Sequence, residues 1–247
     1  MAFGSDRKYM TQAQADASQI DVGLRQYMMK VYNMMALGLG LTGLVALLVA
    51  NNPAIFGLFF QRSASGSIGP NLLGWAALLA PIGLALWLSF RINSMRASSA
   101  ATMFYAYAGL MGISLSMYLQ IYTGVSVART FFITASAFAG LSLWGYVTKK
   151  DLSGFGSFLI MGLWGLIIAS VVNIFLGSSM MSFIISAAGV LIFAGLTAYD
   201  TQKIKEMYLA ADDGETASKK AIFGALTLYL DFINLFIYLL RFLGDRR

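Results

Sequence analysis

The sequence predicts an all-α integral membrane protein with seven transmembrane helices. Hydrophobic residues make up 58% of the chain and charged residues only 11%, whereas soluble domains carry about 25% charged residues. Seven apolar runs are each long enough to cross a hydrocarbon core of about 30 Å as a helix. They cover residues 31–50, 71–90, 100–121, 128–147, 155–177, 180–200 and 221–244. We therefore expect a single membrane domain over residues 21–247, preceded by a mobile cytoplasmic tail over residues 1–20.

The first elements follow from local signals. The polar N-terminal segment has no apolar core after a basic start, so it does not match a cleavable signal peptide. Asp21 is predicted to cap the first helix, which then enters the membrane near Val31. Pro81 lies inside the second run and should kink that helix. The link at Leu176–Ser179 is short enough only for a tight antiparallel hairpin.

The distribution of cations predicts the orientation. Twelve of the 17 Lys and Arg residues lie in the N-terminal segment or near the loops after the second, fourth and sixth runs. Segments rich in Lys and Arg remain in the cytoplasm. With an odd number of spans, the N-terminus is predicted to be cytoplasmic and the C-terminus outside. This placement also accounts for the net charge of +6, so we expect a lipid bilayer as partner and no nucleic acid.

The last apolar run, Ala221–Gly244, carries a polar stripe along one helical face. Asp231 lies near its middle, where an ionised carboxylate in lipid would be costly. Steps of three and four residues place further polar or small side chains on the same face. They are Gly224, Thr227, Asn234, Tyr238 and Arg241. The stripe must face protein or water, so this helix should be the most enclosed. Thr227, Asn234, Tyr238 and Arg241 are the predicted polar path, and a stripe that merely joins helices is the alternative.

A second acid, Asp200, closes the sixth run. The sixth helix should continue to about Tyr208, because no Gly or Pro stops it, and Asp200 would then match the depth of Asp231. Two such carboxyl groups in a low dielectric share a proton. Protonated, they hydrogen-bond and hold the sixth helix against the seventh; doubly ionised, they repel. This pattern indicates a pH-sensitive ion leak, with the two carboxylates as a weak cation site completed by carbonyl groups and water.

Other chemistries are less compatible with the residues. The chain has no Cys and no His, which excludes disulfides, thiolate metal sites and imidazole catalysis. Gly38, Gly40 and Gly43 match a dinucleotide fingerprint, but they lie inside an apolar run, where glycines let helices approach closely. Asp200 and Asp231 are similar to the pair of presenilin-type proteases, yet Tyr-Leu precedes Asp231 where that family has Gly-x-Gly. We expect neither an enzyme nor a cofactor.

Several motifs identify a resemblance that covers the chain from about Arg25. They are Leu-Tyr-Leu-Asp231-Phe-Ile-Asn-Leu-Phe with Leu-Arg-Phe-Leu-Gly244, Ala-Tyr-Asp200-Thr-Gln-Lys-Ile-Lys, the Lys149-Lys-Asp-Leu-Ser loop and the Lys30-Val-Tyr-Asn-Met-Met opening. This pattern resembles the Bax-inhibitor-one family of transmembrane proteins, in a bacterial member.

The resemblance implies a fold and a function. It implies six helices wrapped around a central seventh, a di-aspartyl sensor at Asp200 and Asp231, and a proton-dependent calcium leak across the bacterial inner membrane. Calcium enters as the permeating ion. In this family an arginine at the cytoplasmic end of the second helix interacts with the acid pair. Arg91 is the best match, and Arg96 is the alternative. The chain has no acid around Ala80, where some bacterial members carry one.

A membrane adaptor is the competing function class. Such a protein would bind other membrane proteins, for example a membrane quality-control protease, without transporting anything. The N-terminal segment Met1–Gln19 would be the segment that binds these partners.

Overall fold

The computed structural model describes residues 12–62 and 68–247, with side chains from residue 21 on apart from that of residue 93. Its helices follow the predicted spans closely. They are α1 (Gln12–Asn51), α2 (Pro53–Phe59), α3 (Leu72–Arg91), α4 (Ala97–Ile121), α5 (Gly124–Val147), α6 (Ser153–Leu176), α7 (Ser179–Glu206) and α8 (Gly214–Leu243). All but α2 are long and apolar enough to cross a membrane, which confirms the seven predicted spans in the described residues.

The start of the first helix differs from the prediction. Because α1 begins at Gln12, Asp21 lies inside the helix and the predicted cap is wrong. The residues between Gln12 and Asp21 are mostly Ala, Gln, Asp and Ser, with no Gly or Pro, so nothing stops the helix from extending out of the apolar run. Residues 12–20 of the predicted tail are therefore helical, and residues 1–11 lie outside the described part.

Two predictions about the later helices agree with the structure. α7 runs without interruption past Asp200 to Glu206, two residues short of the predicted end. The link between α6 and α7 is a tight turn in which Gly177 has φ 60°, a left-handed conformation that favours glycine. The side chain of Asn173 accepts a hydrogen bond from the Ser178 N–H (3.1 Å) and closes this turn.

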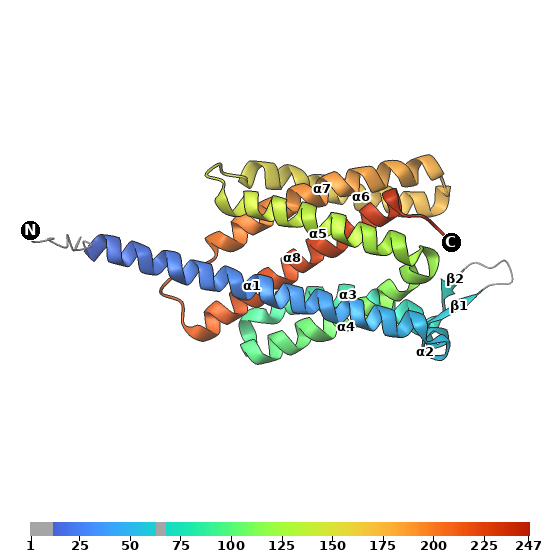
Figure 1. Cartoon of the computed structure of the whole chain (residues 1–247), viewed down its shortest axis with the longest axis horizontal. Coiled ribbons are helices and arrows are strands. Elements are labelled where there is room, and N and C mark those ends of the chain that lie inside the picture. Colours follow the sequence, from blue (N-terminus) through green and yellow to red (C-terminus); the bar gives the residue numbers. More distant parts are fainter. Residues whose placement is uncertain (1–11, 63–67) are drawn as a thin grey trace, which may run out of the picture.

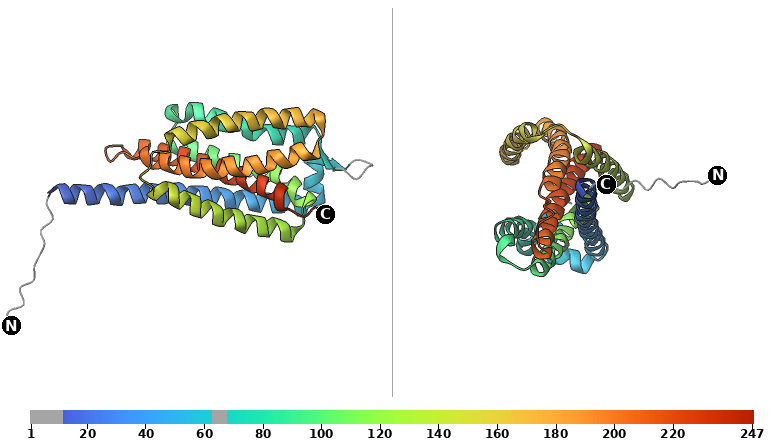
Figure 2. Two further views of the ribbon diagram at one scale, coloured as in Figure 1. Left: turned by 90° about the horizontal axis from the view of Figure 1, so that it is seen from above. Right: turned by 90° about the vertical axis from the view of Figure 1, so that its left-hand side faces the viewer.

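Helix α8 forms the centre of the bundle (Figures 1 and 2). Within its apolar span 67% of the residues are buried, compared with 11–44% in the other six spans. It packs directly on α1, α4, α5 and α7, whereas α3 packs chiefly on α4 and α6 on α7. The span that carries the Asp231 stripe is thus shielded from lipid, as the stripe predicted. Two of the six surrounding helices, α3 and α6, lie one layer farther from α8.

A buried hydrogen bond fixes α8 against α1 and α4. The Thr42 hydroxyl of α1 donates toward the carbonyl groups of Gly38 and Ala108 (2.9 and 2.8 Å). It therefore accepts the hydrogen bond from the Tyr229 hydroxyl, whose oxygen lies 2.6 Å away. A Cβ atom at Gly38 would lie 2.7 Å from the Phe104 ring. Gly38 is the member of the glycine motif that permits close packing.

The end of the bundle opposite the start of α1 carries the short elements. Helix α2 leads into strand β1 (Phe60–Arg62), which pairs antiparallel with β2 (Ile68–Pro70). The C-terminal residues lie at the same end, where Arg246 forms a β-bridge with Tyr122. The start of α1 and the C-terminal residues therefore lie at opposite ends of the bundle (Figure 1), as an odd number of spans requires.

Candidate functional site: the Asp200–Asp231 pair

The structure brings the two predicted acids together at the contact between α7 and α8. Asp231 is buried, with 4% of its surface exposed, and Asp200 is half-buried. Their carboxyl groups lie within hydrogen-bonding reach of each other. A carboxylate has no hydrogen to donate, so a hydrogen bond at this contact requires one of the two groups to hold a proton. The contact depends on α7 continuing past Asp200 as a helix.

The surroundings offer little other compensation for Asp231. Its Oδ2 atom is buried and receives no hydrogen bond from a nitrogen or hydroxyl group in the described part of the chain. The cation whose charge acts on Asp200 is Lys203, one helical turn farther along α7. The Lys203 ammonium also lies 5.8 Å from the centre of the Tyr199 ring. The pair therefore combines one enclosed acid with one acid that faces a cation near the helix end.

Hydroxyl groups next to Asp200 join three helices. Thr201 of α7 donates to the Thr197 carbonyl (2.7 Å), and its oxygen lies 2.9 Å from that of Ser142 in α5. Ser142 in turn lies 2.7 Å from the Tyr32 hydroxyl of α1. Because Thr201 donates to a carbonyl group, Ser142 donates to Thr201 and Tyr32 donates to Ser142. This series of hydrogen bonds ends at the backbone carbonyl of Thr197, so it ties the helices together and does not relay protons.

Gln202 secures the other side of α7. Its side-chain oxygen accepts from the Leu152 N–H (2.9 Å) and its amide donates to the Lys150 carbonyl (2.8 Å). The loop between α5 and α6 is thereby bound to the helix that carries Asp200. Sequence reasoning missed Thr201 and Gln202 as positioning residues. The available signal was their polarity directly after Asp200, at the end of an apolar run.

The predicted polar path has two different parts. Thr227 and Asn234 donate to carbonyl groups of their own helix, at Phe223 (3.0 Å) and Leu230 (2.8 Å). Farther along, the Tyr238 ring stacks on Phe193 of α7 with 5.7 Å between ring centres. Arg241 then lines a cavity of about 270 Å³ together with Ser170, Asn173 and Ser182. Near the C-terminal end of α8, the stripe therefore faces α7 and α6.

The structure does not bring the predicted arginines to the acids. Arg91 is the exposed last residue of α3, and its carbonyl accepts a hydrogen bond from the Ser94 hydroxyl (2.9 Å). No ion pair joins Arg91 or Arg96 to a described acid. Arg96 occupies the cap position of α4 without a capping side-chain bond.

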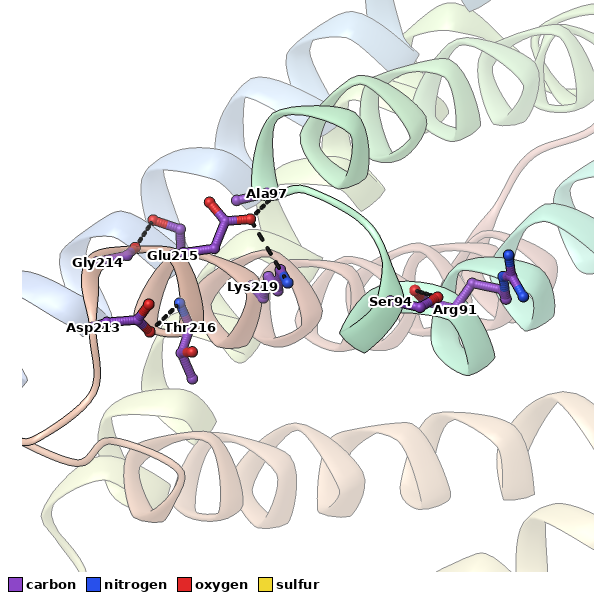
Figure 3. Close-up of polar contacts among 9 residues, drawn as sticks. Arg91, Ser94, Ala97, Asp213, Gly214, Glu215, Thr216 and Lys219 are labelled. Carbon is purple, nitrogen blue, oxygen red and sulfur yellow. Dashed lines mark hydrogen bonds and ion pairs between the residues drawn. The ribbon is translucent and has the colours of Figure 1, made fainter.

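Glu215 ties the start of α8 to α4 instead. Its carboxylate accepts from the Ala97 N–H (2.6 Å) and lies 3.7 Å from the Lys219 ammonium, with Arg91 apart from this cluster (Figure 3). Asp213 caps α8 by accepting from the Thr216 N–H (2.9 Å). The hydrogen bonds from Thr216 lower the pKa of Asp213, since they stabilise its ionised form.

Comparison with known proteins agrees with these motifs. The family model described as "Inhibitor of apoptosis-promoting Bax1" matches residues 24–247. The chain is 51% identical to the protein RP147 of Rickettsia prowazekii over 92% of both chains. It is 44% identical to the inner membrane protein YbhL of Escherichia coli, over 91% of this chain and 94% of that protein. It is also 35% identical to a membrane protein of Streptococcus pyogenes, over 92% and 96% of the two chains. This integral membrane protein, with seven membrane spans in the part of the chain that the structure describes, belongs to the Bax-inhibitor-one family.

Proposed function

We propose that this protein is a pH-sensitive calcium leak across the membrane, gated by the Asp200–Asp231 pair. The observation that carries the proposal is that the two carboxyl groups lie within hydrogen-bonding reach of each other, one of them on the most enclosed helix of the bundle. Buried acids in membrane spans mark ion and proton pathways. A shared proton between two acids is a switch that responds to pH.

The gate follows from the chemistry of the pair. While a proton is shared, the hydrogen bond holds α7 against α8. When the second carboxyl group ionises, the bond is lost and the two like charges repel each other. Separation of α7 from α8 then opens the polar face of Asn234, Tyr238 and Arg241. Calcium passes as the permeating ion, held weakly by the two carboxylates with carbonyl groups and water.

The proposal also gives the orientation of the protein in the membrane and a role for Arg91. The N-terminus is placed in the cytoplasm and the C-terminus outside, because the cation-rich end of the bundle is the one where α1 begins. Arg91, at the same end, decides the outcome of ionisation: if it moves onto the ionised Asp200, it neutralises the new charge and holds the gate closed, and if it is displaced, the path opens. In the structure Arg91 forms no ion pair with Asp200.

The test is calcium flux into liposomes that contain the pure protein, over a series from about pH 5 to about pH 8 chosen to find the midpoint of the pair. Asp231→Asn keeps the shape and removes the shared proton, so flux should lose its pH dependence. Asp151→Asn is the matched control, since it makes the same acid-to-amide change in an exposed loop acid. Its profile should equal that of the wild type. An unchanged pH profile in Asp231→Asn would end the sensor hypothesis.

Arg91→Ala separates gating from anchoring. If Arg91 meets the ionised pair, its removal shifts the midpoint of the flux profile upward, because an opposite charge favours the ionised form. An unchanged midpoint leaves Arg91 only an anchoring role at the lipid headgroups. A wild-type protein that carries no calcium at any pH would instead favour an adaptor that acts on a membrane protease.

A further inference from the structure

A crevice between α1 and α5 leads from the membrane toward the central helix. α1 packs on α4 and α8, and α5 packs on α7 and α8, so the two helices form opposite walls. The crevice has a cavity of about 1050 Å³, lined by residues that include Gly40 and Gly43 of α1, Phe131 and Ala135 of α5 and Phe232 of α8. Both walls are membrane spans. The crevice therefore opens at the depth of the hydrocarbon core.

The glycine motif of α1 contributes to this crevice. A Cβ atom at Gly38 would meet Phe104 and Tyr229, whereas one at Gly40 or Gly43 would meet no atom within 4 Å. Close packing thus explains Gly38 and leaves the other two glycines unexplained. Gly40 and Gly43 make the crevice wider by lacking side chains at its wall.

Toward the end where α1 begins, a cation lines the space between α1 and α5. A second cavity of about 470 Å³ lies between the same helices and is lined by Arg25, Tyr32, Phe138 and Tyr146 among others. None of its lining residues is an acid. Arg25 is exposed and forms no ion pair with a described residue, not even with Asp21 one turn earlier. A positive charge without an ion-pair partner among the described residues therefore lies at the end of an apolar crevice.

We propose that one phospholipid with an anionic headgroup is resident in this crevice, with its phosphate at Arg25 and an acyl chain running past Tyr32 to Gly40. The distance from Arg25 to Gly40 matches the depth of one bilayer leaflet. Arg25 and Gly40 are about 22 Å apart along α1 at a rise of 1.5 Å per residue. In a bilayer of 40–45 Å in total, the headgroup region of one leaflet lies about 20–22 Å from the midplane. The occupant is thus a lipid of the leaflet on the Arg25 side.

The test is native mass spectrometry of the purified full chain, after exchange into detergent with added phosphatidylglycerol or phosphatidylethanolamine. The wild type should retain one phosphatidylglycerol per chain through washes that remove the other lipid. Gly40→Leu fills the crevice and should abolish retention. Arg25→Gln should weaken retention about five-fold, since an exposed ion pair contributes up to ~1 kcal/mol.

Gly83→Leu is the matched control. Gly83 lies on the exposed membrane face of α3, and a Cβ atom there also meets nothing within 4 Å. This variant makes the same change in helix propensity and apolar bulk away from the crevice, so it should retain the lipid. If Gly40→Leu does not fold, Ala135→Leu fills the crevice from the α5 wall.

Three results would overturn the proposal. Equal retention by all variants would mean that only annular lipid was measured. Retention without preference between the two lipids, unchanged in Arg25→Gln, would remove the phosphate site. A dimer mass that disappears in Gly40→Leu would assign the crevice to a second copy of the chain.

Discussion

Substituting Gly145 tests how closely α5 must approach α7 beside the acid pair. A Cβ atom at Gly145 would lie 2.2 Å from the Ala198 carbonyl oxygen and 2.9 Å from its carbon. Ordinary contacts begin near 3.4 Å, so Gly145→Ala forces the two backbones apart by about 1 Å. The obstacle is backbone, which cannot turn away as a flexible side chain can. Overpacking of this kind costs about 1–3 kcal/mol.

Gly140 supplies the reference on the same helix. A Cβ atom there meets nothing within 4 Å, so Gly140→Ala makes the same chemical change without the clash. The gain in helix propensity of up to ~1 kcal/mol is common to both variants and cancels in their difference. The unfolding free energies should therefore differ by about 1–3 kcal/mol, with Gly140→Ala the more stable.

The assay is thermal unfolding of both purified variants in the same detergent, followed by circular dichroism. For a chain of this length, 1 kcal/mol shifts the Tm by about 2–4 °C, so the two Tm values should differ by roughly 2–12 °C. Equal Tm values would refute the close approach of α5 to α7. A lower Tm in Gly140→Ala would reverse the assignment of which α5 face is packed.

Two further predictions concern stability. Tyr229→Phe removes a donor from Thr42 and should cost about 0.5–1.5 kcal/mol, whereas Thr42→Val leaves the buried Tyr229 hydroxyl without an acceptor and should cost about 1–3 kcal/mol. The reverse order in thermal unfolding would contradict the assignment of Tyr229 as donor. Asp213→Ala should lower the Tm at neutral pH, because the ionised cap of α8 is lost. The folded-state pKa of Asp213 lies below 3.8, so its contribution is present above that value and disappears as the pH falls through the folded pKa. A Tm difference between Asp213→Ala and the wild type that is the same in acid as at neutral pH would exclude this linkage.

Much of the architecture was predictable because the bilayer imposes strong local requirements. A span needs about 20 apolar residues, so hydropathy alone placed all seven membrane helices found in the described residues. The enclosure of α8 followed from Asp231 and Asn234, since a polar stripe cannot face lipid. The continuation of α7 past Asp200 followed from the lack of Gly and Pro. These features depend on neighbours in the chain, and the sequence contains them directly.

Side-chain partners required the tertiary structure. Arg91 matched the family position, yet the cation that acts on Asp200 in the structure is Lys203, because the rotation of α7 and the course of α3 decide which charge is near. Gly38 packs against Phe104 while Gly40 faces open space, although both belong to one sequence motif. The difference arises from the angle of about 100° between successive residues on a helix and from which helices surround α1. Hydropathy determined which segments cross the membrane, but only the packing of one helix on another decided which of their side chains meet.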